Sequence, residues 1–184
     1  CMISKENKKK LIELKEYVAL ATINSKYANA NIELIKYMTE EVKSPGVYVT
    51  LNKPFRTIES DLKNSKIDTR VIIFIDAVTK TAGGEIKKID QCLFIGSPEN
   101  LSDISIAMDQ AISSLKEKDK FLFFDSLNTL LLYNTAETVA RFIHFLAGKM
   151  RIWKVKGIII SLEKKANKEL IEELSQFCDI KFEM

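Results

Sequence analysis

The stretch VALATINSKYANANIELIKYM, residues 18–38, decides the fold. It opens as a short apolar run, continues as a polar loop, and ends in a segment whose apolar residues recur at helical spacing. A strand, a loop and a helix in that order form the first unit of a parallel α/β sheet. We therefore expect the rest of the chain to repeat this unit.

Apolar strands alternate with helical segments along the whole chain, as this expectation requires. Runs rich in Val, Ile and Phe predict strands at 17–22, 46–51, 70–76, 92–96, 120–125, 155–161 and 179–183. Helical periodicity predicts helices at 101–115, 135–151 and 167–177, and residues 79–90 are expected to form a loop or small hairpin outside the main sheet. The predicted fold class is α/β, a three-layer α/β/α arrangement with a mostly parallel central sheet.

Length and composition indicate one domain. With 184 residues, 46% of them hydrophobic, the chain is long enough to bury a full core. We expect a flexible basic N-terminus at 1–10 and a single domain at 11–184. No apolar run is long enough to cross a bilayer and no signal peptide is evident, so the expected location is cytoplasmic, with no membrane partner.

Metal and nucleic-acid sites find little support in the sequence. Three cysteines without a C-x-x-C pair and one histidine give no set of metal ligands, so the predicted metal site is none. The net charge of +3 is modest, and most lysines alternate with acidic residues. Nucleic acid is therefore an unlikely partner.

The loop within 18–38 has the layout of a phosphate-binding loop but lacks its residues. Such a loop reads G-x-x-x-x-G-K-[ST], because glycines bring backbone amides close to the phosphates and the lysine adds a charge. The matching positions here are Asn24, Ser25, Lys26, Tyr27, Ala28, Asn29, Ala30 and Asn31. Asn24 and Asn29 replace the glycines, and asparagine tolerates the left-handed backbone that glycine provides. The backbone path is therefore expected to survive without its donors, the alternative being an ordinary strand–turn–helix connection.

A second stretch, KFLFFDSLNTLLLY at 120–133, joins the first in pointing to a family. Its apolar strand ending in Asp125-Ser126 resembles the Walker B element of RecA/KaiC-like ATPases. GVYVTLNKP at 46–54 resembles their next strand, and 97–108, 138–150 and 156–179 agree in order and spacing. The chain thus looks like an archaeal KaiC-like protein with a RecA-like P-loop NTPase core and a degenerate Walker A loop.

The resemblance implies a nucleotide site in which the loop wraps phosphates, Asp125 holds magnesium through water, and a glutamate after the second strand activates the attacking water. Ala30 stands at the lysine position, Asn31 at the Ser/Thr position and Asn52-Lys53 at the glutamate position. Asn52 has no carboxylate with which to accept a proton. We therefore interpret Asp125 first as a structural carboxylate that accepts bonds from backbone amides, and second as a magnesium ligand.

The sequence favours a non-hydrolysing, pseudo-ATPase domain that acts as a regulatory or scaffold protein, with no catalytic residue and no cofactor. Its expected partner is a protein such as a paralogous ATPase, or further copies of itself in a homo-oligomer. The alternative is an ATP-binding protein or slow ATPase that uses ATP/Mg with Lys26 and Asp125.

Overall fold

The computed structural model describes residues 3–24, 29–162 and 168–184. In chain order the elements are α1 (Lys5–Glu13), β1 (Tyr17–Ile23), α2 (Ala30–Lys36), the π-helix η1 (Tyr37–Glu41), β2 (Gly46–Thr50), α3 (Phe55–Asn64), the 3₁₀-helix η2 (Thr69–Val71), β3 (Ile72–Asp76), β4 (Cys92–Phe94), α4 (Leu101–Ser114), β5 (Phe121–Asp125), α5 (Leu127–Tyr133), α6 (Ala136–Trp153), β6 (Lys156–Leu162), α7 (Lys168–Ser175) and β7 (Ile180–Glu183). All the predicted strands are present, and their ends agree with the prediction to within two residues.

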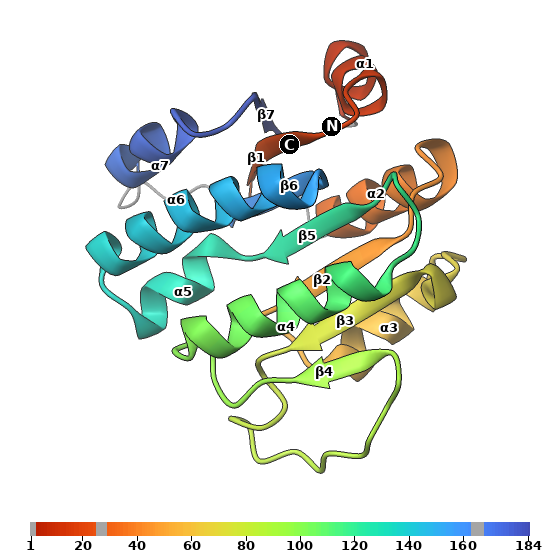
Figure 1. Ribbon diagram of the computed structural model, residues 1–184, viewed down its shortest axis with the longest axis vertical. Helices are drawn as coiled ribbons and strands as arrows, with labels where there is room; N and C mark the ends of the chain where they lie inside the picture. Colours follow the sequence, from red (N-terminus) through yellow and green to blue (C-terminus); the bar gives the residue numbers. More distant parts are fainter. Residues whose placement is uncertain (1–2, 25–28, 163–167) are drawn as a thin grey trace.

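The strands form one sheet with helices on both faces, which confirms the α/β fold class (Figure 1). Strand order is β4-β3-β2-β5-β6-β1-β7, and every pairing between these strands is parallel. Residues 79–90 lie outside the sheet except for an isolated bridge between Ile89 and Cys92. The loop expected there is therefore confirmed.

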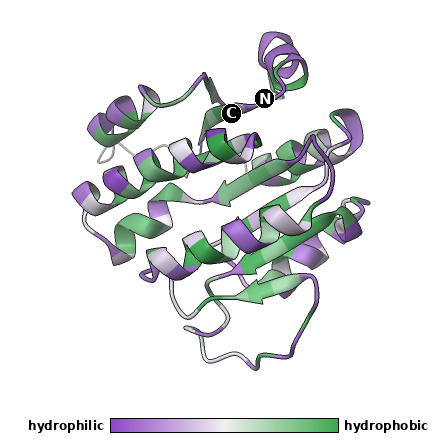
Figure 2. Ribbon diagram, viewed as in Figure 1, coloured by the Kyte–Doolittle hydropathy of each residue, from purple (hydrophilic) through white to green (hydrophobic). Residues whose placement is uncertain are grey.

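Alternation along each strand divides the core into two clusters. In β5, Phe121 and Phe123 face the cluster that α1, α2 and α3 cover, whereas Leu122 and Phe124 face the cluster covered by α4, α5, α6 and α7. Figure 2 shows the strands of this two-sided core as the most hydrophobic part of the ribbon. A strand buried on both faces must be apolar at nearly every position, which is why these runs are continuous in the sequence.

The connections that follow the neighbouring strands β2 and β5 run toward opposite edges of the sheet. From β2 it continues to β3 and β4 on one side, and from β5 it continues to β6 on the other. A crevice at the carboxyl ends of two such neighbouring strands is where open α/β sheets bind ligands. The candidate site is therefore expected beyond Thr50 and Asp125, the last residues of these strands.

A short helix lies near the N-terminus of the described residues. Residues 5–13 form α1, whose Leu11 is fully buried and whose Lys8 carbonyl accepts a hydrogen bond of 2.9 Å from the Tyr37 hydroxyl. No helix in the described ranges 3–24, 29–162 and 168–184 is long and apolar enough to cross a membrane.

Three connections that lead into strands contain a lysine in the left-handed backbone conformation. Lys43, Lys66 and Lys154 have φ of 57°, 62° and 55°, and they follow the ends of η1, α3 and α6. This conformation favours glycine, since a side chain there costs about 1 kcal/mol.

We expect each of the substitutions Lys43→Gly, Lys66→Gly and Lys154→Gly to raise the free energy of unfolding by up to about 0.5 kcal/mol. Relief of the left-handed strain, about 1 kcal/mol, outweighs the lost attraction between an exposed lysine and the helix end, about 0.3 kcal/mol. Urea denaturation measures the change. The control Lys116→Gly has no left-handed strain to relieve and is expected to lower stability by a few tenths of a kcal/mol, about the usual entropic cost of glycine. A loss of stability in all three variants would contradict this account.

Candidate functional site

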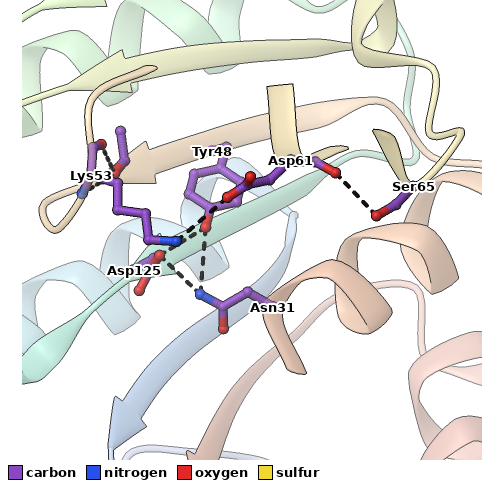
Figure 3. A network of polar contacts seen from close by, with 7 residues as sticks. Asn31, Tyr48, Lys53, Asp61, Ser65 and Asp125 are labelled. Atoms are coloured by element: carbon purple, nitrogen blue, oxygen red, sulfur yellow. Dashed lines mark hydrogen bonds and ion pairs between the residues drawn. The ribbon is translucent and has the colours of Figure 1, made fainter. Parts of the chain in front are cut away.

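The predicted Walker residues meet at the carboxyl end of the sheet, between β2 and β5. Asp125 ends β5, Asn52 lies two residues beyond β2, and Asn31 is the second residue of α2. Tyr48, inside β2, points its hydroxyl toward the same place (Figure 3). The structure thus brings Asn31 and Asp125 together, as the resemblance implied.

Asp125 is almost completely buried, at 5% exposure, and both of its carboxylate oxygens accept hydrogen bonds from neutral side chains. Oδ2 accepts from the Tyr48 hydroxyl at 2.8 Å and from Asn31 Nδ2 at 2.9 Å, as Figure 3 shows. Oδ1 accepts from Asn52 Nδ2 at 2.7 Å. The donors come from α2, β2 and the segment after β2, so this one carboxylate ties three parts of the chain to β5.

Asn52 is itself held in place by α5 and its N-cap. Its Nδ2 also lies 3.2 Å from Ser126 Oγ, and its Oδ1 accepts a hydrogen bond from the Thr129 hydroxyl. Both the nitrogen and the oxygen of the Asn52 side-chain amide therefore make hydrogen bonds. We call Asn31, Tyr48, Asn52, Asp125 and Thr129 together the Asp125 network.

These contacts correct one expectation from the sequence. Asp125 was expected to accept bonds from nearby backbone amides, but among residues 3–24, 29–162 and 168–184 its donors are the side chains of Asn31, Tyr48 and Asn52. The reason is the strand order, because β2 lies next to β5 and brings Tyr48 and Asn52 within reach.

Burial raises the pKa of the Asp125 carboxyl above its ordinary value of 3.8, because the charged form loses water. The bonds from Tyr48, Asn52 and Asn31, and the charge of nearby Lys53, oppose that rise without cancelling it. Burial also raises the pKa of the Tyr48 hydroxyl, which keeps it protonated as a donor. Lys53 points its amine toward Asp61, 3.4 Å away (Figure 3).

A pH series should detect this shift in the pKa of Asp125. The folded protein holds the proton more tightly than the unfolded chain, so the stability of the wild type relative to Asp125→Asn should fall as pH rises above 3.8. At pH values above the pKa of Asp125 in the folded protein, this stability difference should no longer change with pH. Urea unfolding of both proteins at several pH values measures this difference. A difference that instead grew with pH would mean that the folded state favours the anion.

The remaining positions of the predicted loop differ from a phosphate-binding loop. Asn29 has a φ of −107°, so the left-handed backbone expected there is absent, and its side chain makes no capping bond to α2. Ala30, at the lysine position, is 3% exposed and packs into the core cluster beneath α2. Ser25, Lys26, Tyr27 and Ala28 lie outside the described residues. Asn24 ends the strand side of the loop, where its backbone N–H donates to the Met184 carbonyl.

A second buried carboxylate, Asp76 at the end of β3, was missed by the sequence analysis. It is fully buried and accepts from the backbone amides of Phe55, Val78 and Thr79 at 2.7 to 2.8 Å, and from the Thr79 hydroxyl. Asp76 thus anchors the start of α3 and the turn after β3. The signal in the sequence was an aspartate that ends a strand with a threonine three residues later, a pattern that forms turns of this kind.

The arrangement offers little to a metal ion. Within residues 3–24, 29–162 and 168–184, no group of three or more His, Cys, Asp or Glu side chains is placed to hold one. Magnesium binds through oxygen ligands with the help of water. At Asp125, Oδ2 already accepts hydrogen bonds from the amide of Asn31 and the hydroxyl of Tyr48.

Comparison with known proteins places this geometry in context. The model of a family of unknown function (DUF7504) matches residues 37–184. No curated protein sequence matches the chain.

Solved structures from the archaeon Pyrococcus horikoshii are similar in fold. A KaiC-like protein shares 15% identity at a TM-score of 0.56, covering 80% of this chain, which spans only 61% of that protein's length. A second protein, solved in a structural study, shares 15% identity at a TM-score of 0.62, covering 98% of this chain and 87% of that one. These similarities confirm the KaiC-like, RecA-like fold expected from the sequence.

Proposed function

We propose, from the premise that this chain belongs to the family of unknown function DUF7504, that it is a non-hydrolysing RecA/KaiC-like domain which acts by binding other proteins. In this role it is a regulatory or scaffold protein whose partner is a paralogous ATPase, another protein or a further copy of itself. The observation that carries the proposal is the direct hydrogen bond between Asn31 and Asp125.

That bond uses an oxygen of the carboxylate that the resemblance assigns to a magnesium ion. In the arrangement implied by the resemblance, Asp125 would hold the ion through water. Here the amide of Asn31 donates straight to Asp125 Oδ2 at 2.9 Å. A magnesium ion would have to displace this donor and desolvate, so the cost of breaking the network opposes its binding.

The groups that would grip and cut a nucleotide are also replaced. Each missing charge-assisted bond costs about 1.5 to 3 kcal/mol, at least about tenfold in affinity. Ala30 offers no charge, and its methyl group points into the core. Asn52 cannot take a proton from water, and its amide already binds Asp125 and Thr129.

Titration calorimetry with Mg-ATP and a phosphate-release assay test the proposal. We expect the calorimetric titration to show no Mg-ATP binding tighter than a dissociation constant of about 1 mM. This is roughly the affinity that remains after the loss of these contacts. Phosphate release should equal the background of a buffer blank in the wild type and in Asp125→Asn alike. Micromolar binding, or a phosphate release that Asp125→Asn abolishes, would support an ATP-binding protein or slow ATPase instead.

A further inference from the structure

The edge of the sheet opposite the Asp125 network carries a row of exposed lysines. At this edge the chain enters the strands, and the connections that lead into β2, β3 and β5 lie together at the right-hand side of Figure 1. Figure 2 shows them as largely hydrophilic. The exposed lysines that precede β1, β2, β3, β5 and β6 are Lys15, Lys43, Lys66, Lys116, Lys118 and Lys154.

These lysines follow the order of the sheet. The strands β3, β2, β5, β6 and β1 are consecutive neighbours, and each is preceded by at least one of them. Neighbouring strands are about 4.8 Å apart, so the row extends over roughly 19 Å. In the part of the chain that the structure describes, no carboxylate lies within 4.0 Å of the amine of any of the six.

Two other lysines at the same edge show how a structural lysine behaves in this protein. Lys120 donates to the carbonyls of Ile112 and Leu115 at the end of α4, and Lys156 is buried and donates to the Leu14 carbonyl. Among the residues whose structure is described, the amines of the six lysines in the row make no such bonds. Their amines remain available to a partner.

The left-handed backbone strengthens this distinction. Every non-glycine residue with positive φ in the described ranges is a lysine of this row: Lys43, Lys66 and Lys154. Each stands where glycine would fit with less strain. The preference of left-handed backbone for glycine is thus overridden at three positions, each time by lysine and each time at this edge of the sheet. Departures of this kind from local conformational preference are expected at functional surfaces.

We propose that this lysine row is the docking surface for the acidic face of a protein partner. The inference rests on the proposed function, because it locates the surface through which that function would operate. Glu16, Glu41, Glu117 and Asp119 are interspersed in the same connections. Such a surface, with more lysines than carboxylates, suits a protein face that is acidic overall and carries some basic residues, whereas the uniform negative charge of a nucleic-acid backbone meets repulsion from these carboxylates.

The absence of stacking platforms also favours a protein partner. The exposed large aromatic residues of the described chain are Tyr133 and Phe145, which lie on α5 and α6 rather than in these connections. The bases of a single-stranded nucleic acid would therefore find, in the described residues of these connections, no exposed ring on which to stack.

Fluorescence anisotropy with a labelled acidic peptide, in which single lysines are interspersed among glutamates, tests the surface. The protein should bind the peptide at low ionic strength and release it as salt is added. The combined variant Lys43→Gly, Lys66→Gly and Lys154→Gly should bind about tenfold more weakly, roughly the product of three modest charge contacts. Because these substitutions are expected to keep or raise stability, unfolding would not explain the loss.

The matched control removes the same charge elsewhere. Lys80, Lys87 and Lys88 are exposed in the connection between β3 and β4, at the bottom of Figure 1, and their replacement by alanine should change affinity by less than about twofold. Equal losses in both triple variants, or no peptide binding by the wild type, would overturn the docking surface. Tighter binding of a short DNA duplex than of the peptide would overturn the choice of a protein partner. Each of these results is independent of nucleotide binding, which tests the proposed function separately.

Discussion

Replacing Asp125 by alanine is expected to lower the free energy of unfolding by about 3 kcal/mol. The Tyr48 hydroxyl and the amides of Asn31 and Asn52 would lose the oxygen atoms to which they donate. A buried donor left without a partner costs about 1 to 3 kcal/mol, and Tyr48 is only 1% exposed. Urea denaturation, monitored by circular dichroism, measures this loss.

The sign of that change separates the two interpretations of Asp125. A carboxylate kept for binding a ligand commonly lies in a site that is not optimised for stability, so its removal leaves the free protein equally or more stable. A carboxylate that joins α2, β2 and β5 stabilises the fold. Tyr48→Phe, which removes one donor and leaves two, should cost only about 1 kcal/mol, and Asp90→Ala, at an exposed loop position, less than about 0.5 kcal/mol. A stability gain in Asp125→Ala would contradict the structural role.

Asp76→Ala is expected to have an effect at least as large, about 3 to 5 kcal/mol. Three backbone amides and one hydroxyl donate to this fully buried carboxylate, and two of those amides belong to the turn at Val78 and Thr79. Backbone donors cannot turn toward another acceptor as a side chain can. The start of α3 and the turn after β3 should therefore loosen together.

Hydrogen exchange provides a specific readout for Asp76. In the variant, the amides of Phe55, Val78 and Thr79 should exchange faster, while that of Val47 in β2 changes much less. Thr79→Val removes only the hydroxyl donor and should cost about 1 kcal/mol. Uniform acceleration of exchange across the sheet would indicate general destabilisation rather than local release.

The strands could be predicted closely because burial on both faces leaves a continuous apolar run. VKGIIIS and KFLFFD are examples, and the observed β6 and β5 begin within one residue of the predicted starts. The partners of Asp125 could not be predicted, because which strand lies beside β5 depends on the order of the sheet. The sequence places Asn52 and Asp125 73 positions apart, and only the pairing of β2 with β5 brings them together.

The start of α2 shows a different limit. Asparagine tolerates left-handed backbone but does not require it, so its presence at position 29 left the local conformation undecided. Glycine at the same position would have been more informative. The sequence also could not predict that Ala30 packs into the core, because alanine occurs on either face of a helix.

The position of β1 has a consequence for how the chain folds during synthesis. Its two neighbours are β6 and β7, which occupy residues 156–162 and 180–183. Ala19 therefore finds its partner Ile158 only 139 residues later in the chain, and its partner Ile180 161 residues later. Until then β1 has both edges unpaired, whereas β2 and β3 pair at once. Emerging chains that stop before β6 would therefore present an apolar strand to chaperones or to one another, and folding of the first strand must wait for the last two.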